Sequence, residues 1–153
     1  MLNVVLYQPA IPPNTGNVSR QCVGMNAHLH LIAPKFEVSD NTVKRAGLDY
    51  WPYLKLTQYP DEQAFLDWLG DRQPWLVTKF GVHRYDRPAY VDEDILIFGN
   101  ENTGLPEAWH QRWPDRTVHI PIMGEIRSFN LSNTVAIVLA QATLTARLYP
   151  THS

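Results

Sequence analysis

Short apolar runs alternate along this chain with segments of helical periodicity. The runs expected to form strands cover residues 2–7, 28–32, 53–57, 75–78, 95–98 and 118–121. Helices are expected from near residue 14 to 25, over 41–46, 61–69 and 130–149, and after Pro106, which suits a first helical turn. Buried strands that alternate with helices form parallel sheets with right-handed crossovers. The alternation predicts an α/β fold with a mostly parallel sheet and helices on both faces.

Length and composition favour a single domain that spans residues 1–153. A chain of 153 residues, 44% hydrophobic and 18% charged, can bury a sizeable core. It has no apolar run near the roughly 20 residues that a membrane-spanning helix needs, so we expect no membrane contact. The first seven residues lack a basic lead and a cleavage site, and we interpret them as a strand and not as a signal peptide. A cytoplasmic location is the expectation.

Cysteine and histidine usage argues against a disulfide and against a metal site. The chain has one cysteine, Cys22, which lies in an expected helix and is predicted to be a buried structural thiol. His28 and His30 alternate along an expected strand, and no Cys/His cluster has zinc spacing, so we expect no metal. The net charge of −2 argues against a protein that coats nucleic acid nonspecifically, but it leaves room for RNA binding by a local patch.

A first polar motif, NTGNVSR, covers residues 14–20 and follows the first expected strand. Within a helix Asn17 and Arg20 lie on the same face, and Gly16 allows a close approach of a ligand or of other backbone. The alternative interpretation is that Asn14 caps the helix and Arg20 is a solvated charge.

A second motif, GNENTGLP, covers residues 99–106 between an expected strand and an expected helix. It places free N–H groups at the carboxyl end of a strand, where open α/β sheets bind ligands. The motif therefore predicts a pocket. The alternative is a glycine-rich turn in which Glu101 serves as a helix-entry carboxylate.

A third motif, SFNLSN, covers residues 128–133 at the start of the longest expected helix. Ser128 or Asn130 could act only as the N-cap of that helix. Hydroxyl and amide side chains are more numerous here than capping requires, which favours a binding role.

In order and spacing these motifs resemble the three signature motifs of the SPOUT RNA methyltransferases. Together with RAGLDY at residues 45–50, they look very similar to one subgroup, which methylates the ribose 2'-oxygen of cytidine or uridine 34 in tRNA. The resemblance covers residues 1–149. It implies a deep C-terminal trefoil knot, S-adenosyl-L-methionine as the cofactor, the tRNA anticodon stem-loop as the substrate, and a homodimer with each pocket completed near the subunit interface.

The resemblance also implies roles for individual residues. The catalytic arginine would be Arg20, with Asn14 and Glu101 as its partners. The cofactor pocket would use mainly backbone groups of six residues: Val77, Gly99, Ile120, Ser128, Asn130 and Leu131. A basic patch for the substrate would comprise Lys44, Arg45, Arg84, Arg87 and Arg127, although simple solvation could explain each of these charges.

The reaction that the resemblance implies needs no metal, because the sulfonium of the cofactor already carries a reactive methyl group. A guanidinium is almost never deprotonated in a protein, so Arg20 is a poor general base. Our hypothesis is that Arg20 stabilises the developing alkoxide and holds the adjacent phosphate, while water or another group takes the proton. Two alternatives stay open: methylation of another tRNA or rRNA site, and a noncatalytic RNA-binding protein that keeps the knot.

Overall fold

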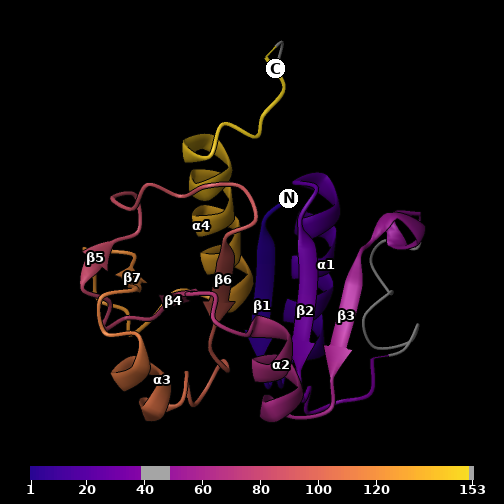
Figure 1. Cartoon of the computed structure of the whole chain (residues 1–153), viewed down its shortest axis with the longest axis horizontal. Coiled ribbons are helices and arrows are strands. Elements are labelled where there is room, and N and C mark those ends of the chain that lie inside the picture. The colour runs from indigo at the N-terminus through magenta and orange to yellow at the C-terminus, as the bar shows by residue number, and fades with distance from the viewer. Residues whose placement is uncertain (39–48, 152–153) are drawn as a thin grey trace.

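One parallel sheet organises the molecule (Figure 1). The computed structural model describes residues 1–38 and 49–151, and within them a seven-stranded sheet has the order β3-β2-β1-β6-β4-β7-β5. Each neighbouring pair of strands is parallel. The strands are β1 (Asn3–Tyr7), β2 (His28–Ile32), β3 (Leu56–Tyr59), β4 (Trp75–Val77), β5 (His83–Arg84), β6 (Ile95–Phe98) and β7 (Thr117–His119).

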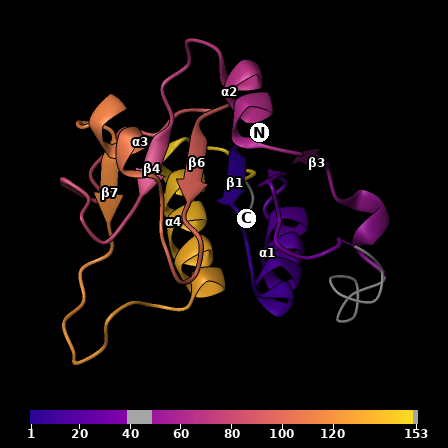
Figure 2. The ribbon, with the colours of Figure 1, turned by 90° about the horizontal axis from the view of Figure 1, so that it is seen from below.

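Helices cover both faces of the sheet (Figure 2). Two of them, α1 (Pro12–Gly24) and α4 (Leu131–Thr145), lie side by side on one face. The other face carries α2 (Glu62–Leu69) and α3 (Glu107–Arg112). A short 3-10 helix, η2 (Trp51–Tyr53), packs beside α1. This three-layer arrangement confirms the predicted fold class.

Two hydrophobic clusters fill the space between the sheet and its helices. Because side chains alternate along a strand, Val4 and Leu6 of β1 join the cluster under α1 and α4, while Val5 joins the cluster under α2 and α3. Cys22 is fully buried in the first cluster, as predicted. Burial raises the pKa of its thiol to about 12, so this sulfur stays protonated and unreactive.

The strand expected over residues 53–57 is wrong in its position. Residues 51–53 form η2 instead, with Pro52 in its first turn, and the Tyr53 side chain is 79% exposed. The strand begins only at Leu56 and ends at the buried Tyr59. Proline at the start of a helical turn, where its missing N–H costs nothing, explains the shift.

Other boundaries differ by a few residues. The last helix ends at Thr145 and not at 149, because Arg147 adopts a left-handed backbone with φ of 58°. The first helix begins at Pro12. Strand β5, only two residues long and paired only with β7 at the edge of the sheet, was not predicted because two residues show no alternation. The helix expected over residues 41–46 lies outside the described residues.

Candidate functional site

The carboxyl ends of three adjacent strands gather the first group of predicted site residues. Val77, the last residue of β4, is in register with Phe98 of β6 and with Val118 of β7. Gly99 directly follows Phe98, and Ile120 comes two residues after Val118. The structure therefore brings Val77, Gly99 and Ile120 together at the sheet edge formed by the carboxyl ends of the strands, where ligands bind in open α/β folds.

The loop that follows β6 is held in shape by Asn100. Its side-chain amide donates to the carbonyl of Gln8 at 2.6 Å, and its side-chain oxygen accepts from the backbone N–H groups of Asn102 and Thr103 at 2.8 and 3.0 Å. Two further backbone hydrogen bonds, of 3.1 and 3.0 Å, join Asn100 to Gly104. The second motif is therefore a closed turn anchored to the end of β1.

Gly99 is required by close backbone packing in this turn. A β-carbon at this position would lie 2.6 Å from the carbonyl carbon of Gly104 and 2.7 Å from its Cα, closer than real contacts allow. Gly104 itself has a φ of 71°, which favours glycine. Close packing at Gly99 and the positive φ of Gly104 thus explain why this motif has glycine at both positions.

Glu101 holds the beginning of α1. Its carboxylate accepts from the backbone N–H groups of Ala10 and Ile11 at 3.0 Å each, and from the side-chain amide of Asn14 at 3.3 Å. Ile11 is the N-cap of α1 and has no side chain that can cap, so a carboxylate about 90 residues away satisfies these donors. Glu101 therefore does accept hydrogen bonds at the start of a helix. That helix is α1, however, and not α3, which follows the loop that contains Glu101.

Asn14 and Asn130 connect this anchor to the third motif. Asn14 lies within α1, is buried and is not the N-cap of this helix. Its side-chain oxygen accepts from the side-chain amide of Asn130 at 3.1 Å. Asn130 in turn caps α4, accepting from the backbone N–H of Ser132 at 2.9 Å and from its hydroxyl at 2.6 Å. One hydrogen-bond chain, Glu101–Asn14–Asn130, therefore joins all three motifs.

The segment between β7 and α4 stands out from the body of the molecule (Figure 2). Residues 123–130 are exposed, Ser128 among them, and Met123 is 98% exposed. Within residues 121–129, one backbone hydrogen bond is formed, from Ile126 N–H to the Gly124 carbonyl at 3.2 Å. Few main-chain groups of this segment therefore bond to one another. Leu131 begins α4 and packs half-buried on the first core cluster.

Arg20 lies on the exposed side of α1. Its guanidinium carbon is 5.8 Å from the centre of the Tyr50 ring. In the described part of the chain no hydrogen bond or ion pair joins Arg20 to Asn14 or to Glu101, and no other carboxylate pairs with it. The neighbour that the structure gives this arginine is Tyr50. Its pairing with Asn14 and Glu101 stays a prediction.

Three residues of the predicted basic patch, Arg84, Arg87 and Arg127, lie on the surface, and the patch itself stays a prediction. Arg84 in β5 forms an ion pair with Asp86, with Nε 2.5 Å from Oδ1, and this pairing raises the pKa of Arg84 and lowers that of Asp86. Arg87 and Arg127 are exposed. Lys44 and Arg45 lie outside the described residues.

A shallow hollow lies beside α3, apart from the predicted cofactor residues. It is lined by Phe80, Val82, Glu107, His110, Pro114 and Thr117. Among the residues that the structure describes, no group of three His, Cys, Asp or Glu side chains could hold a metal ion. No helix of the described ranges is long and apolar enough to cross a bilayer.

Two residues that shape the site were not assigned a role from the sequence. Asn100 carries a usable signal, because an asparagine that accepts from N–H groups two and three residues later is typical of a tight turn. Tyr50 carries no such signal. Its contact with Arg20 depends on how η2 packs against α1.

Comparison with known proteins places these features in a family. The model of the "SpoU rRNA Methylase family" matches residues 1–140. A protein of Escherichia coli strain K12 named "tRNA (cytidine(34)-2'-O)-methyltransferase" is 40% identical over 144 residues, which cover 93% of this chain and 92% of that protein.

Solved structures give the same result. A structure described as "Structural insights into the 2-OH methylation of C/U34 on tRNA" matches with a TM-score of 0.88 and 37% identity, covering 96% of this chain and 91% of that one. The SpoU methyltransferase AviRb from Streptomyces viridochromogenes, in complex with the cofactor AdoMet, matches with a TM-score of 0.84 and 26% identity. That match covers 97% of this chain and 58% of AviRb.

Proposed function

Because this chain belongs to the SpoU rRNA methylase family, we propose that it transfers a methyl group from S-adenosyl-L-methionine to the ribose 2'-oxygen of nucleotide 34, the wobble position, of tRNA. The E. coli relative that bears this activity in its name aligns with 93% of the chain. The observation that carries the proposal is the Glu101–Asn14–Asn130 chain, because it joins the three motifs of the methyltransferase around one sheet edge.

The residues at this edge suit S-adenosyl-L-methionine. Val77, Ile120 and Leu131 offer apolar surface, while the loops at 99–104 and 121–129 offer backbone donors and acceptors. An adenine and a methionine moiety need this combination of apolar walls and a few polar groups. When bound, the cofactor supplies an electrophilic methyl group on a positively charged sulfur.

Arg20 supplies the positive charge for the reacting sugar. Its guanidinium is exposed and has no carboxylate partner in the described residues, so its donors are available to a phosphate and to the 2'-oxygen. We propose that Arg20 stabilises the negative charge that develops on this oxygen and holds the neighbouring phosphate, while water accepts the proton. Asn14 and Glu101 then act on the reaction by fixing the start of the helix that carries Arg20.

We propose that the protein is a homodimer, in which each Arg20 meets a cofactor loop of the partner subunit. Helix α4 is apolar on its outer side as well as on its buried side: Ile137 and Ala140 are half-buried, and Leu144 is 63% exposed. A helix that is apolar all round is covered by other protein. We propose that a second copy packs on this outer side. The deep trefoil knot is part of the same proposal, and a tRNA substrate is consistent with a cytoplasmic location.

Mapping of ribose methylation tests the function directly. Mass spectrometry of tRNA from cells with and without the gene should show that 2'-O-methylation of nucleotide 34 depends on the protein. Complementation with an Arg20→Ala variant should leave that nucleotide unmodified, whereas an exposed Asp71→Asn variant should restore it. Unchanged methylation at position 34 would overturn the proposal, and loss at another tRNA or rRNA position would reassign the substrate.

A further inference from the structure

The guanidinium of Arg20 lies over the ring of Tyr50. The guanidinium carbon of Arg20 is 5.8 Å from the ring centre, within the distance at which a cation is attracted to an aromatic face. We infer that Tyr50 is a positioning residue for the methyl transfer, which holds the Arg20 guanidinium in its working orientation. The inference rests on the proposed function of Arg20.

Tyr50 is itself held firmly in place. Its side chain is only 9% exposed, and its hydroxyl donates to the carbonyl of Gly16 at 3.2 Å. Gly16 lies one helical turn before Arg20, on the same face of α1. Tyr50 therefore bonds to α1 at the Gly16 carbonyl and contacts the Arg20 side chain one turn later.

The protonation state of Tyr50 suits this task. Burial raises the pKa of the phenol, and the charge of Arg20 opposes this change only in part. The hydroxyl thus stays protonated near neutral pH and donates to the Gly16 carbonyl, and the ring stays neutral beneath the guanidinium.

An aromatic face is a particular kind of support for a catalytic guanidinium. A carboxylate partner would occupy the N–H donors of Arg20 and neutralise its charge, whereas a ring attracts the cation and leaves the donors in the guanidinium plane free. No carboxylate of the described residues pairs with Arg20. Tyr50 can therefore fix the orientation of Arg20 while leaving the side chain able to bind a phosphate and the 2'-oxygen.

Steady-state kinetics on the purified full-length protein, with tRNA and S-adenosyl-L-methionine, test the inference. Tyr50→Leu removes the aromatic face and should lower kcat by about fivefold or more, with the Kd for S-adenosyl-L-methionine unchanged by calorimetry. Tyr50→Phe keeps the face and should retain kcat within about twofold of the parent. Tyr53→Leu, a change at a ring that is 79% exposed three residues away, is the matched control and should change nothing.

An isosteric pair keeps the test decisive if Tyr50→Leu does not fold. Pentafluorophenylalanine has nearly the shape of phenylalanine but an electron-poor face, so Tyr50→pentafluorophenylalanine should have a lower kcat than Tyr50→Phe. Equal kcat for these two variants would overturn the inference, as would a Tyr50→Phe variant as slow as Tyr50→Leu. A parent protein without methyl transfer to nucleotide 34 would instead refute the proposed function.

Discussion

The side-chain amide of Asn130 donates to the side-chain oxygen of Asn14 at 3.1 Å, across 116 residues of sequence. The side-chain amide of Asn14 in turn donates to the carboxylate of Glu101 at 3.3 Å. The starts of α1 and α4 and the loop after β6 are thus fixed relative to one another. A substitution of any one of these three side chains should lower both the free energy of unfolding and the affinity for S-adenosyl-L-methionine.

Glu101→Gln should weaken this connection. A glutamine amide has one accepting oxygen, and its NH2 group would face an N–H donor of Ala10 or Ile11. We expect the free energy of unfolding to fall by about 1–3 kcal/mol, since a partly buried donor loses its acceptor, and we expect weaker binding of S-adenosyl-L-methionine. Urea unfolding and calorimetry measure the two effects. Asp71→Asn, at an exposed carboxylate, is the control, and equal stability of the two variants would contradict the role of Glu101.

Gly99→Ala should be more damaging than its single methyl group suggests. The new β-carbon would lie 2.6 Å from the Gly104 backbone, so the loop after β6 must move. We expect a loss of about 1–3 kcal/mol in unfolding free energy and little or no binding of S-adenosyl-L-methionine. Gly24→Ala is the matched control because nothing lies within 4 Å of its β-carbon position. Thermal unfolding and calorimetry of both variants decide the matter, and a Gly99→Ala variant that binds normally would contradict the prediction.

The sequence predicted most of the fold because its central strands are buried on both faces and are read as continuous apolar runs. Residues 95–98 show this plainly: all four are buried, and they form β6 as expected. The region of residues 51–59 was harder because Pro52 and aromatic residues suit either a short helix or a strand. Pro52 in the first turn of η2 and the packing of η2 against α1 together account for the outcome, and such packing cannot be read from local propensity.

The candidate site was predictable in its positions but not in its partners. Motif residues after β6 and before α4 fell at strand and helix ends, as the element pattern suggested. The bond of Glu101 to Asn14, however, spans 87 residues, and no periodicity reveals such a pair. For Arg20 the neighbour found in the structure is Tyr50, and no local pattern in the sequence reveals that pairing.

Leu144→Glu should separate the proposed dimer. The side chain is 63% exposed on the outer face of α4, and in a symmetric dimer the change would place two carboxylates in the interface. Losing a buried leucine on each side should raise the dissociation constant about 100-fold. Sedimentation should then show monomers with little methyl transfer. Val91→Glu, at a side chain 58% exposed elsewhere, should leave the assembly intact. A Leu144→Glu protein that still sediments as the parent does would exclude this face.

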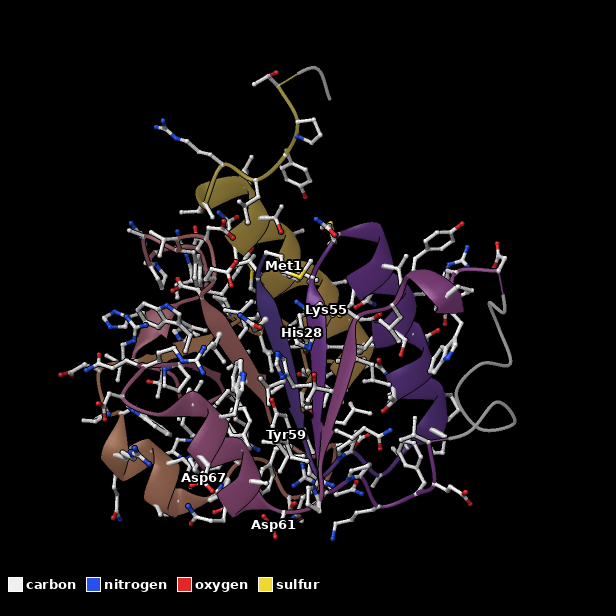
Figure 3. The ribbon with its side chains drawn as sticks, turned by 45° about the vertical axis from the view of Figure 1, so that its right-hand side comes forward. Met1, His28, Lys55, Tyr59, Asp61 and Asp67 are labelled. Atoms are coloured by element: carbon white, nitrogen blue, oxygen red, sulfur yellow. The ribbon has the colours of Figure 1, made fainter. Side chains whose placement is uncertain are left out.

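His30 should make the protein less stable in acid. The ring is fully buried, with Nε2 2.9 Å from the Asn3 side-chain oxygen and Nδ1 2.9 Å from the Tyr59 hydroxyl. It also stacks on His28 at 3.9 Å, and Figure 3 shows His28 and Tyr59 on their neighbouring strands. Burial, followed by the charges of His28, Arg72 and Lys55, lowers the pKa of His30 to about 3.

The sign of this effect follows from proton binding. An unfolded histidine has a pKa of about 6.5, so between that value and about 3 the unfolded state binds more protons than the folded state. Stability is therefore lost as the pH falls through this range, by up to about 1.4 kcal/mol per pH unit. Urea midpoints over this range should fall more steeply for the parent than for His30→Gln. Equal slopes for the parent and His30→Gln would refute the prediction.

Arg20→Lys tests whether a positive charge alone accounts for the role of Arg20. If Arg20 acts as a cation, the lysine variant keeps a positive charge near the 2'-oxygen but loses the planar fork that can hold a phosphate at the same time. We expect partial activity for Arg20→Lys and a loss of about 100- to 1000-fold in kcat for Arg20→Ala. Calorimetry with S-adenosyl-L-methionine, measured for both variants, separates a loss of cofactor binding from a loss of chemistry. An inactive Arg20→Lys variant that binds tRNA as tightly as the parent would mean that a positive charge is not enough, and that the geometry of the guanidinium carries the chemistry.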